Sequence, residues 1–170
     1  MQTASTKSTL KSGNEIDFIF NYEVESMEGE SKQTNQFLAI IDVFSDHPET
    51  LKIKLSSANF GYGYYPEGSK HRWLIRTHAG NSLSLDMKNV DLEKDLDTIT
   101  VYDVQSSGEK KLLSELNVAK QLNTLSNHIL VVFMSDCSVN RGGFSAIVSV
   151  LRDIPTTPAP SITTPAVPSK

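Results

Sequence analysis

The sequence predicts an all-β protein, an antiparallel sandwich or barrel, and three observations support this fold class. Apolar and polar residues alternate along most of the chain, as they do in half-buried strands. The alternating segments are short, and Gly, Asn, Asp and Ser, the residues of tight turns, separate them. Helical spacing is confined to Lys111 to Leu122, where we expect at most a short turn of helix.

The predicted strands follow from apolar residues spaced two positions apart. In chain order these sets are Ile16, Phe18 and Phe20; Leu83, Leu85 and Met87; Ile99 and Val101; Ile129, Val131 and Phe133; and Phe144, Ala146, Val148 and Val150. Turn-forming residues at 78–81 and 106–108 separate some of them. Each set predicts a strand with one face toward a core.

Two parts of the chain resemble each other. Residues 12–20 match residues 125–133, with Asn, Ile and Phe at equal offsets, and a second matching pair of segments follows each. We therefore predict that residues 1–48 are the C-terminal strand pair of a preceding, incomplete copy or an N-terminal extension, and that residues 49–153 are the complete domain. Because any two amphipathic hairpins look alike, chance similarity stays an alternative. An incomplete copy would expose apolar faces, so we expect it to pack on the domain.

The remaining residues, 154–170, form a run rich in Pro, Thr and Ser with few large apolar side chains. Such a run cannot offset the entropy of ordering its backbone, so it predicts an extended linker. Similar tracts form the O-glycosylated stalks of secreted proteins, with a plain spacer as the alternative. The single cysteine, Cys137, excludes an internal disulfide and would by itself favour a reducing compartment.

Composition and motif spacing disfavour several functions. A net charge of −4 without a basic cluster argues against nucleic-acid binding, and no apolar run of about 18 residues predicts a membrane span. The histidines lack zinc-site spacing, and no motif predicts an enzyme. For Cys137 we expect a partly buried structural thiol, because the adjacent Asp136 charge opposes a thiolate nucleophile. The tyrosines of Gly61 to Tyr65 could form a binding surface, although packing over a sheet end is the commoner outcome.

The stretch from Val90 to Asp97, VDLEKDLD, places many carboxylates directly before a predicted strand. Like charges at this density repel unless they spread into solvent or surround a cation. The stretch alone leaves both interpretations open.

The order of motifs from residue 57 onward resembles that of a known family. The matching elements are Ser57-Ala58-Asn59-Phe60, Tyr65-Pro66, Trp73, Asp91-Leu92-Glu93, Asp97 to Asp103 (DTITVYD), Leu112-Leu113, Ser126-Asn127, Phe133 to Ser138 (FMSDCS) and Gly143-Phe144. This series resembles the CUB domain family over about 105 residues. The resemblance implies an extracellular, jelly-roll-like β-sandwich that binds proteins or glycans and is not itself a catalyst.

The resemblance also implies a calcium site at one end of the sandwich. The positions matched by motif are Glu93, Asp97 and Asp136 as ligands, Tyr65 orienting Glu93, and Ser138 and Asn140 in the neighbouring loop. In such sites the ion holds acidic loops whose carboxylates accept a Lys or Arg of a partner. The implied partners are a protein with exposed Lys or Arg, or a glycan, together with neighbouring domains of the same chain.

This sequence departs from the family pattern at two points. His71 stands where a cysteine is expected, and both usual disulfides are absent. Three residues separate Glu93 from Asp97, fewer than in calcium-binding members, which could keep both carboxylates together or turn Glu93 away. Two functions follow: a secreted recognition module, possibly calcium-dependent, or a structural spacer domain with a degenerate site and a solvated acidic rim.

Overall fold

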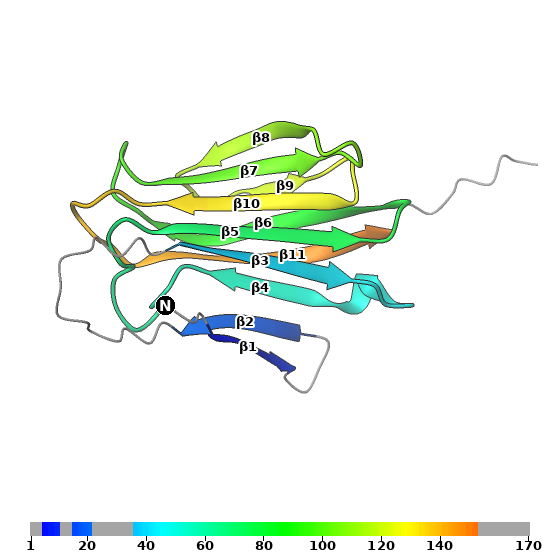
Figure 1. Cartoon of the computed structure of the whole chain (residues 1–170), viewed down its shortest axis with the longest axis horizontal. Helices are drawn as coiled ribbons and strands as arrows, with labels where there is room; N and C mark the ends of the chain where they lie inside the picture. The colour runs from blue at the N-terminus through cyan, green and yellow to red at the C-terminus, as the bar shows by residue number, and fades with distance from the viewer. Residues whose placement is uncertain (1–4, 11–14, 22–35, 153–170) are drawn as a thin grey trace, which may run out of the picture.

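Two β-sheets stack face to face in the computed structural model, which describes residues 5–10, 15–21 and 36–152. The six-stranded sheet contains β1 (Ser5–Leu10), β2 (Glu15–Asn21), β4 (Lys52–Ser56), β11 (Gly143–Arg152), β6 (Asn81–Asp91) and β9 (Gln121–Asn123), in that spatial order. The five-stranded sheet contains β3 (Gln36–Val43), β5 (Lys70–Thr77), β10 (His128–Met134), β7 (Thr98–Val104) and β8 (Lys110–Leu116). A 3-10 turn, η1 (Pro48–Thr50), precedes β4. Figure 1 looks through both sheets.

Strand pairing is antiparallel throughout residues 49–152. The parallel pairs are β2 with β4 and β3 with β5, and both bring in strands from before residue 49. The β1–β2 hairpin thus extends one sheet while β3 extends the other, and Figure 1 shows the hairpin at the edge opposite β7 and β8. These strands join the sheets of the domain, whereas their origin as a preceding copy stays a prediction.

The core lies between the two sheets and consists of the residues that alternate inward. The apolar residues expected in β6, β7, β10 and β11 are buried there, with Trp73 of β5 at the centre. Trp73 makes an edge contact with Phe144 across the sandwich, with ring centroids 5.6 Å apart. The expected fold class is confirmed, because period-two alternation fixes which face of each strand is apolar.

The expectation of helical spacing between Lys111 and Leu122 is wrong. This segment forms most of β8 and the start of β9, and β8 pairs with β7. A register shift in that pairing at Val101 and Tyr102 interrupts the alternation, so that Leu112 faces solvent while Leu116 is buried. The bulge therefore lets a strand accommodate an apolar spacing that is typical of a helix.

Three connections meet at one end of the sandwich, on the left of Figure 1. They link β4 to β5, β6 to β7, and β10 to β11. All the residues predicted to form the calcium site lie in these connections. Residues 154–170, the predicted linker, lie outside the described residues.

Candidate metal-binding site

The structure brings the three predicted carboxylates together. One oxygen of each of Glu93, Asp97 and Asp136 lies within 4.8 Å of the others. Asp97, which immediately precedes β7, is buried, whereas Glu93 and Asp136 are half-buried. The cluster therefore has one fixed, inner carboxylate and two that reach the surface.

Tyr65 supports the cluster from below. Its side chain is fully buried, and its ring packs edge-on against Phe133 with centroids 5.2 Å apart. The hydroxyl donates a hydrogen bond to Asp97 Oδ2 and accepts one from the backbone N–H of Glu93 at 3.1 Å. Burial, followed by the bond to Asp97, raises the pKa of Tyr65 to about 12. Tyr65 thus contacts the backbone of Glu93 and the carboxylate of Asp97.

The short connection between Glu93 and Asp97 forms a tight turn. The N–H of Asp97 donates to the carbonyl of Glu93 at 3.2 Å, and Asp95 adopts a positive φ of 64°, which aspartate tolerates better than most residues. The turn keeps the Glu93 carboxylate in the cluster. The short loop therefore places the carboxylates of Glu93 and Asp97 on the same side and does not turn Glu93 away.

The β10–β11 connection closes the cluster from the other side. Asp136 N–H donates to Asp97 Oδ1 at 3.0 Å, while Glu93 Oε2 accepts from the N–H of Val139 at 3.1 Å. Ser138 Oγ lies 2.6 Å from Glu93 Oε2 and 2.7 Å from Asp136 Oδ1, so its single proton serves one of them at a time. Asn140 follows in the same connection and is half-buried.

The donor set fits a calcium ion by its chemistry and its size. Calcium takes oxygen ligands at about 2.3–2.6 Å, so two ligand atoms of one ion lie at most about 5.2 Å apart. The three carboxylate oxygens lie within 4.8 Å of one another, which is inside that limit. The hydrogen bonds around them hold the groups in position against their mutual repulsion.

At this end of the sandwich, Cys137 differs from expectation and Asp91 had no predicted role. Cys137 is exposed, so the prediction of a partly buried thiol is wrong; its neighbours Asp136 and Ser138 turn toward the cluster instead. Asp91 accepts a hydrogen bond from Gly142 N–H at 3.0 Å. Its place in the motif Asp91-Leu92-Glu93 was the available signal, but nothing in the sequence showed its partner.

The fold and this acidic end define a small β-sandwich domain with a candidate ligand site in its loops. The model of the CUB domain family matches residues 45–147, more than half of the chain. The chain belongs to the CUB domain family, whose members are recognition and interaction modules, generally non-enzymatic, that occur in extracellular proteins. No helix in the described ranges is long and apolar enough to cross a membrane.

Solved structures share the fold at low sequence identity. The full extracellular region of zebrafish Gpr126/Adgrg6 matches with a TM-score of 0.52 and 19% identity, covering 71% of this chain and 15% of that one. The CUB1-EGF-CUB2 domain of human MASP-1/3 has a TM-score of 0.53 and 20% identity, covering 65% and 40%. The MASP-1 CUB2 domain bound to Ca²⁺ has a TM-score of 0.50 and 20% identity, covering 58% and 91%. This chain thus spans less than half of the first two proteins.

Proposed function

We propose that this domain is a non-catalytic extracellular recognition module that binds a Lys or Arg side chain of a partner protein in a calcium-dependent manner. The observation that carries the proposal is the convergence of Glu93, Asp97 and Asp136 to within 4.8 Å. The Ca²⁺-bound MASP-1 CUB2 structure, which shares this fold, supports the same chemistry. The predicted linker 154–170 would join the domain to its neighbours.

The roles of the residues follow from their burial. Buried Asp97, held by Tyr65, would be the fixed ligand, while half-buried Glu93 and Asp136 would share the ion and offer outward carboxylate oxygens. When bound, calcium neutralises part of the cluster charge and fixes the loops. The remaining carboxylate oxygens would then accept a charge-assisted hydrogen bond from the partner's cation.

One observation favours the alternative of a structural spacer with a degenerate site. Protein donors already satisfy the carboxylates: Tyr65 and the N–H of Asp136 for Asp97, and Ser138 and the N–H of Val139 for Glu93. A cluster satisfied in this way can be stable without a cation.

Thermal unfolding of the full chain in EDTA, millimolar calcium or millimolar magnesium separates the two functions. Calcium at 100 times its dissociation constant stabilises the folded state by about 2.7 kcal/mol, which raises the midpoint by several degrees. We expect this rise with calcium, and its loss in Glu93→Gln and Asp136→Asn. The charge-matched control is Glu109→Gln, in the turn before β8 at the opposite end. Equal midpoints in EDTA and calcium would contradict the proposal and favour the spacer.

A further inference from the structure

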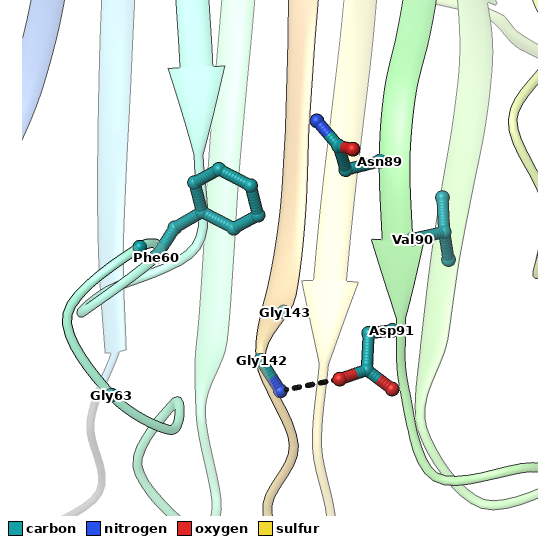
Figure 2. A pocket seen from close by; sticks show the side chains of 8 residues that line it. Phe60, Gly63, Asn89, Val90, Asp91, Gly142 and Gly143 are labelled. Carbon is teal, nitrogen blue, oxygen red and sulfur yellow. Dashed lines mark hydrogen bonds between the residues drawn. The ribbon is translucent and has the colours of Figure 1, made fainter.

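A second hollow lies beside the acidic cluster, on the outer face of the six-stranded sheet. It is an open pocket of about 380 Å³ between the β4–β5 connection and the adjoining ends of β6 and β11. Figure 2 shows the Phe60 ring on one side, Asn89 and Asp91 on the other, and Gly142 and Gly143 between them. None of these residues belongs to the carboxylate cluster described above.

A β-bulge aims the polar side chains into this pocket. Leu85 and Met87 of β6 face the core, so regular alternation would also turn Asn89 and Asp91 inward. The β6–β11 register shifts between Ser145 and Ala146, however, and past the shift Val90 packs against the core while Asn89 and Asp91 are exposed. Bulges commonly re-aim side chains next to binding sites.

The polar groups are held in place by the neighbouring strand. Asp91 Oδ2 accepts from Gly142 N–H at 3.0 Å, and Asn89 Nδ2 donates to Ser145 Oγ at 2.8 Å. A Cβ at Gly142 would lie 2.9 Å from Asp91 Oδ2, so an alanine there would make this carboxylate shift from its position. Each bond fixes the plane of its group and leaves further hydrogen-bonding capacity: the second oxygen of Asp91, and one N–H and the oxygen of Asn89.

The lining selects a class of ligand. The Asp91 carboxylate is the charged group among the lining residues and repels anions. A guanidinium or ammonium group only donates hydrogen bonds, so it could pair with the free oxygens of Asp91 and Asn89 but would leave the free Asn89 N–H without an acceptor. A sugar hydroxyl both donates and accepts, which matches a carboxylate beside a carboxamide. The apolar face of a pyranose matches the Phe60 ring, and the glycines allow close approach.

We propose that this pocket is a saccharide-binding site in which Asp91 and Asn89 hydrogen-bond neighbouring hydroxyls of a neutral pyranose stacked on Phe60. The site adjoins the acidic cluster and does not depend on calcium for its ligand contacts. Tyr62 lies between the lining residues Gly61 and Gly63 and is 98% exposed.

The test is an NMR titration of the ¹⁵N-labelled full chain with the methyl glycosides of glucose, mannose, galactose and N-acetylglucosamine, each in EDTA and in calcium. We expect at least one glycoside to shift the amide resonances of Gly61, Gly63, Gly142 and Gly143 with millimolar affinity. Asp91→Asn should weaken this binding about tenfold, because it removes a charge-assisted acceptor. Gly142→Ala should weaken it while keeping every charge, because its Cβ displaces the Asp91 carboxylate.

The matched control is Asp86→Asn, the same change on the same strand outside the pocket lining, which should bind like the parent chain. An amide spectrum of each variant that retains the dispersion of the parent shows that the fold is intact. The proposal is overturned if no glycoside shifts the resonances of these glycines, whether or not N-acetyl-arginine methylamide shifts them. Glycoside binding is also measured in EDTA, so its result does not depend on whether calcium raises the melting temperature.

Discussion

At the scale of single residues, His71 has an unusual environment. It stands where the family pattern has a cysteine, and its imidazole is fully buried between the sheets. Phe37 of β3 stacks on it at 4.3 Å, and Trp73 and Phe133 make edge contacts at 5.9 and 5.7 Å. Aromatic rings thus surround His71 in the core. Burial lowers the pKa of His71 to about 3, because charging the ring would require removing an ion from water.

The lowered pKa of His71 makes stability depend on pH. The unfolded chain takes up a proton at His71 below about pH 6.5, whereas the folded protein does so only near pH 3. Stability should therefore fall as the pH drops through this window, by up to about 1.4 kcal/mol per pH unit. Urea unfolding between pH 7 and 4 measures the slope, which His71→Leu should reduce.

The control for the pH slope is His47→Leu, at an imidazole whose side chain is 77% exposed. Carboxylates also titrate below pH 5, so the comparison of the two variants isolates the contribution of His71. If the stability of His71→Leu falls with pH as steeply as that of the parent chain, His71 is not the source of the pH dependence.

At the scale of elements, the end of β7 anchors the turn between β9 and β10. Asp103 is fully buried and accepts hydrogen bonds from the N–H of Leu125 at 2.9 Å, the N–H of Ser126 at 3.3 Å and the Ser126 hydroxyl. Asn127 Nδ2 continues the network by donating to the carbonyl of Thr77 on β5 at 2.7 Å. One carboxylate thereby fixes the chain as it passes from the six-stranded to the five-stranded sheet.

Asp103→Asn should destabilise the domain by about 2–4 kcal/mol, although the two side chains have nearly the same shape. The amide presents N–H groups to neighbours that are themselves donors, so these part-buried donors lose an acceptor at a fully buried side chain. Urea unfolding at pH 7 measures the loss. The charge-matched control is exposed Asp46→Asn, which should change stability by less than about 0.5 kcal/mol. Equal stability of both variants would show that the network is dispensable.

At the scale of the whole molecule, β3 closes the core although it precedes the region that matches the family. Its residues Ile41 and Val43 are 5% and 3% exposed, and Phe37 covers His71. By contrast, β1 and β2 extend the other sheet through pairing with β4. The two parts of residues 1–48 should therefore contribute differently to stability.

Truncation tests this difference. Removing residues 1–46 deletes β3 and with it the buried side chains of Ile41 and Val43, each worth about 1.5–3 kcal/mol of burial, and should lower the melting temperature by at least about 10 °C. Removing residues 1–35 retains β3 and should lower it less. If both truncations melt at the same temperature, β3 is not an integral part of the domain.

The sequence alone was enough to predict the all-β class, and its resemblance to the CUB family indicated the candidate calcium ligands. Strand alternation is a local property, so it predicts which face of β6, β7, β10 and β11 is apolar without knowledge of the neighbours. The order of motifs indicated Glu93, Asp97 and Asp136, and the structure places their carboxylates together. Their assignment as ligands awaits the calcium experiment.

Features that depend on how strands pair could be read from the three-dimensional structure but not from the sequence. The bulge in the β6–β11 pairing turns Asn89 and Asp91 outward. A second bulge, in the β7–β8 pairing, lets β8 form a strand where the apolar spacing suggested a helix. Likewise, Tyr65 meets Asp97 across 32 residues, and Asp97 meets Asp136 across 39. Hydrogen bonds between paired strands fix which residues lie opposite each other. A local sequence pattern describes one strand at a time, so it does not predict the register or the contacts between distant residues.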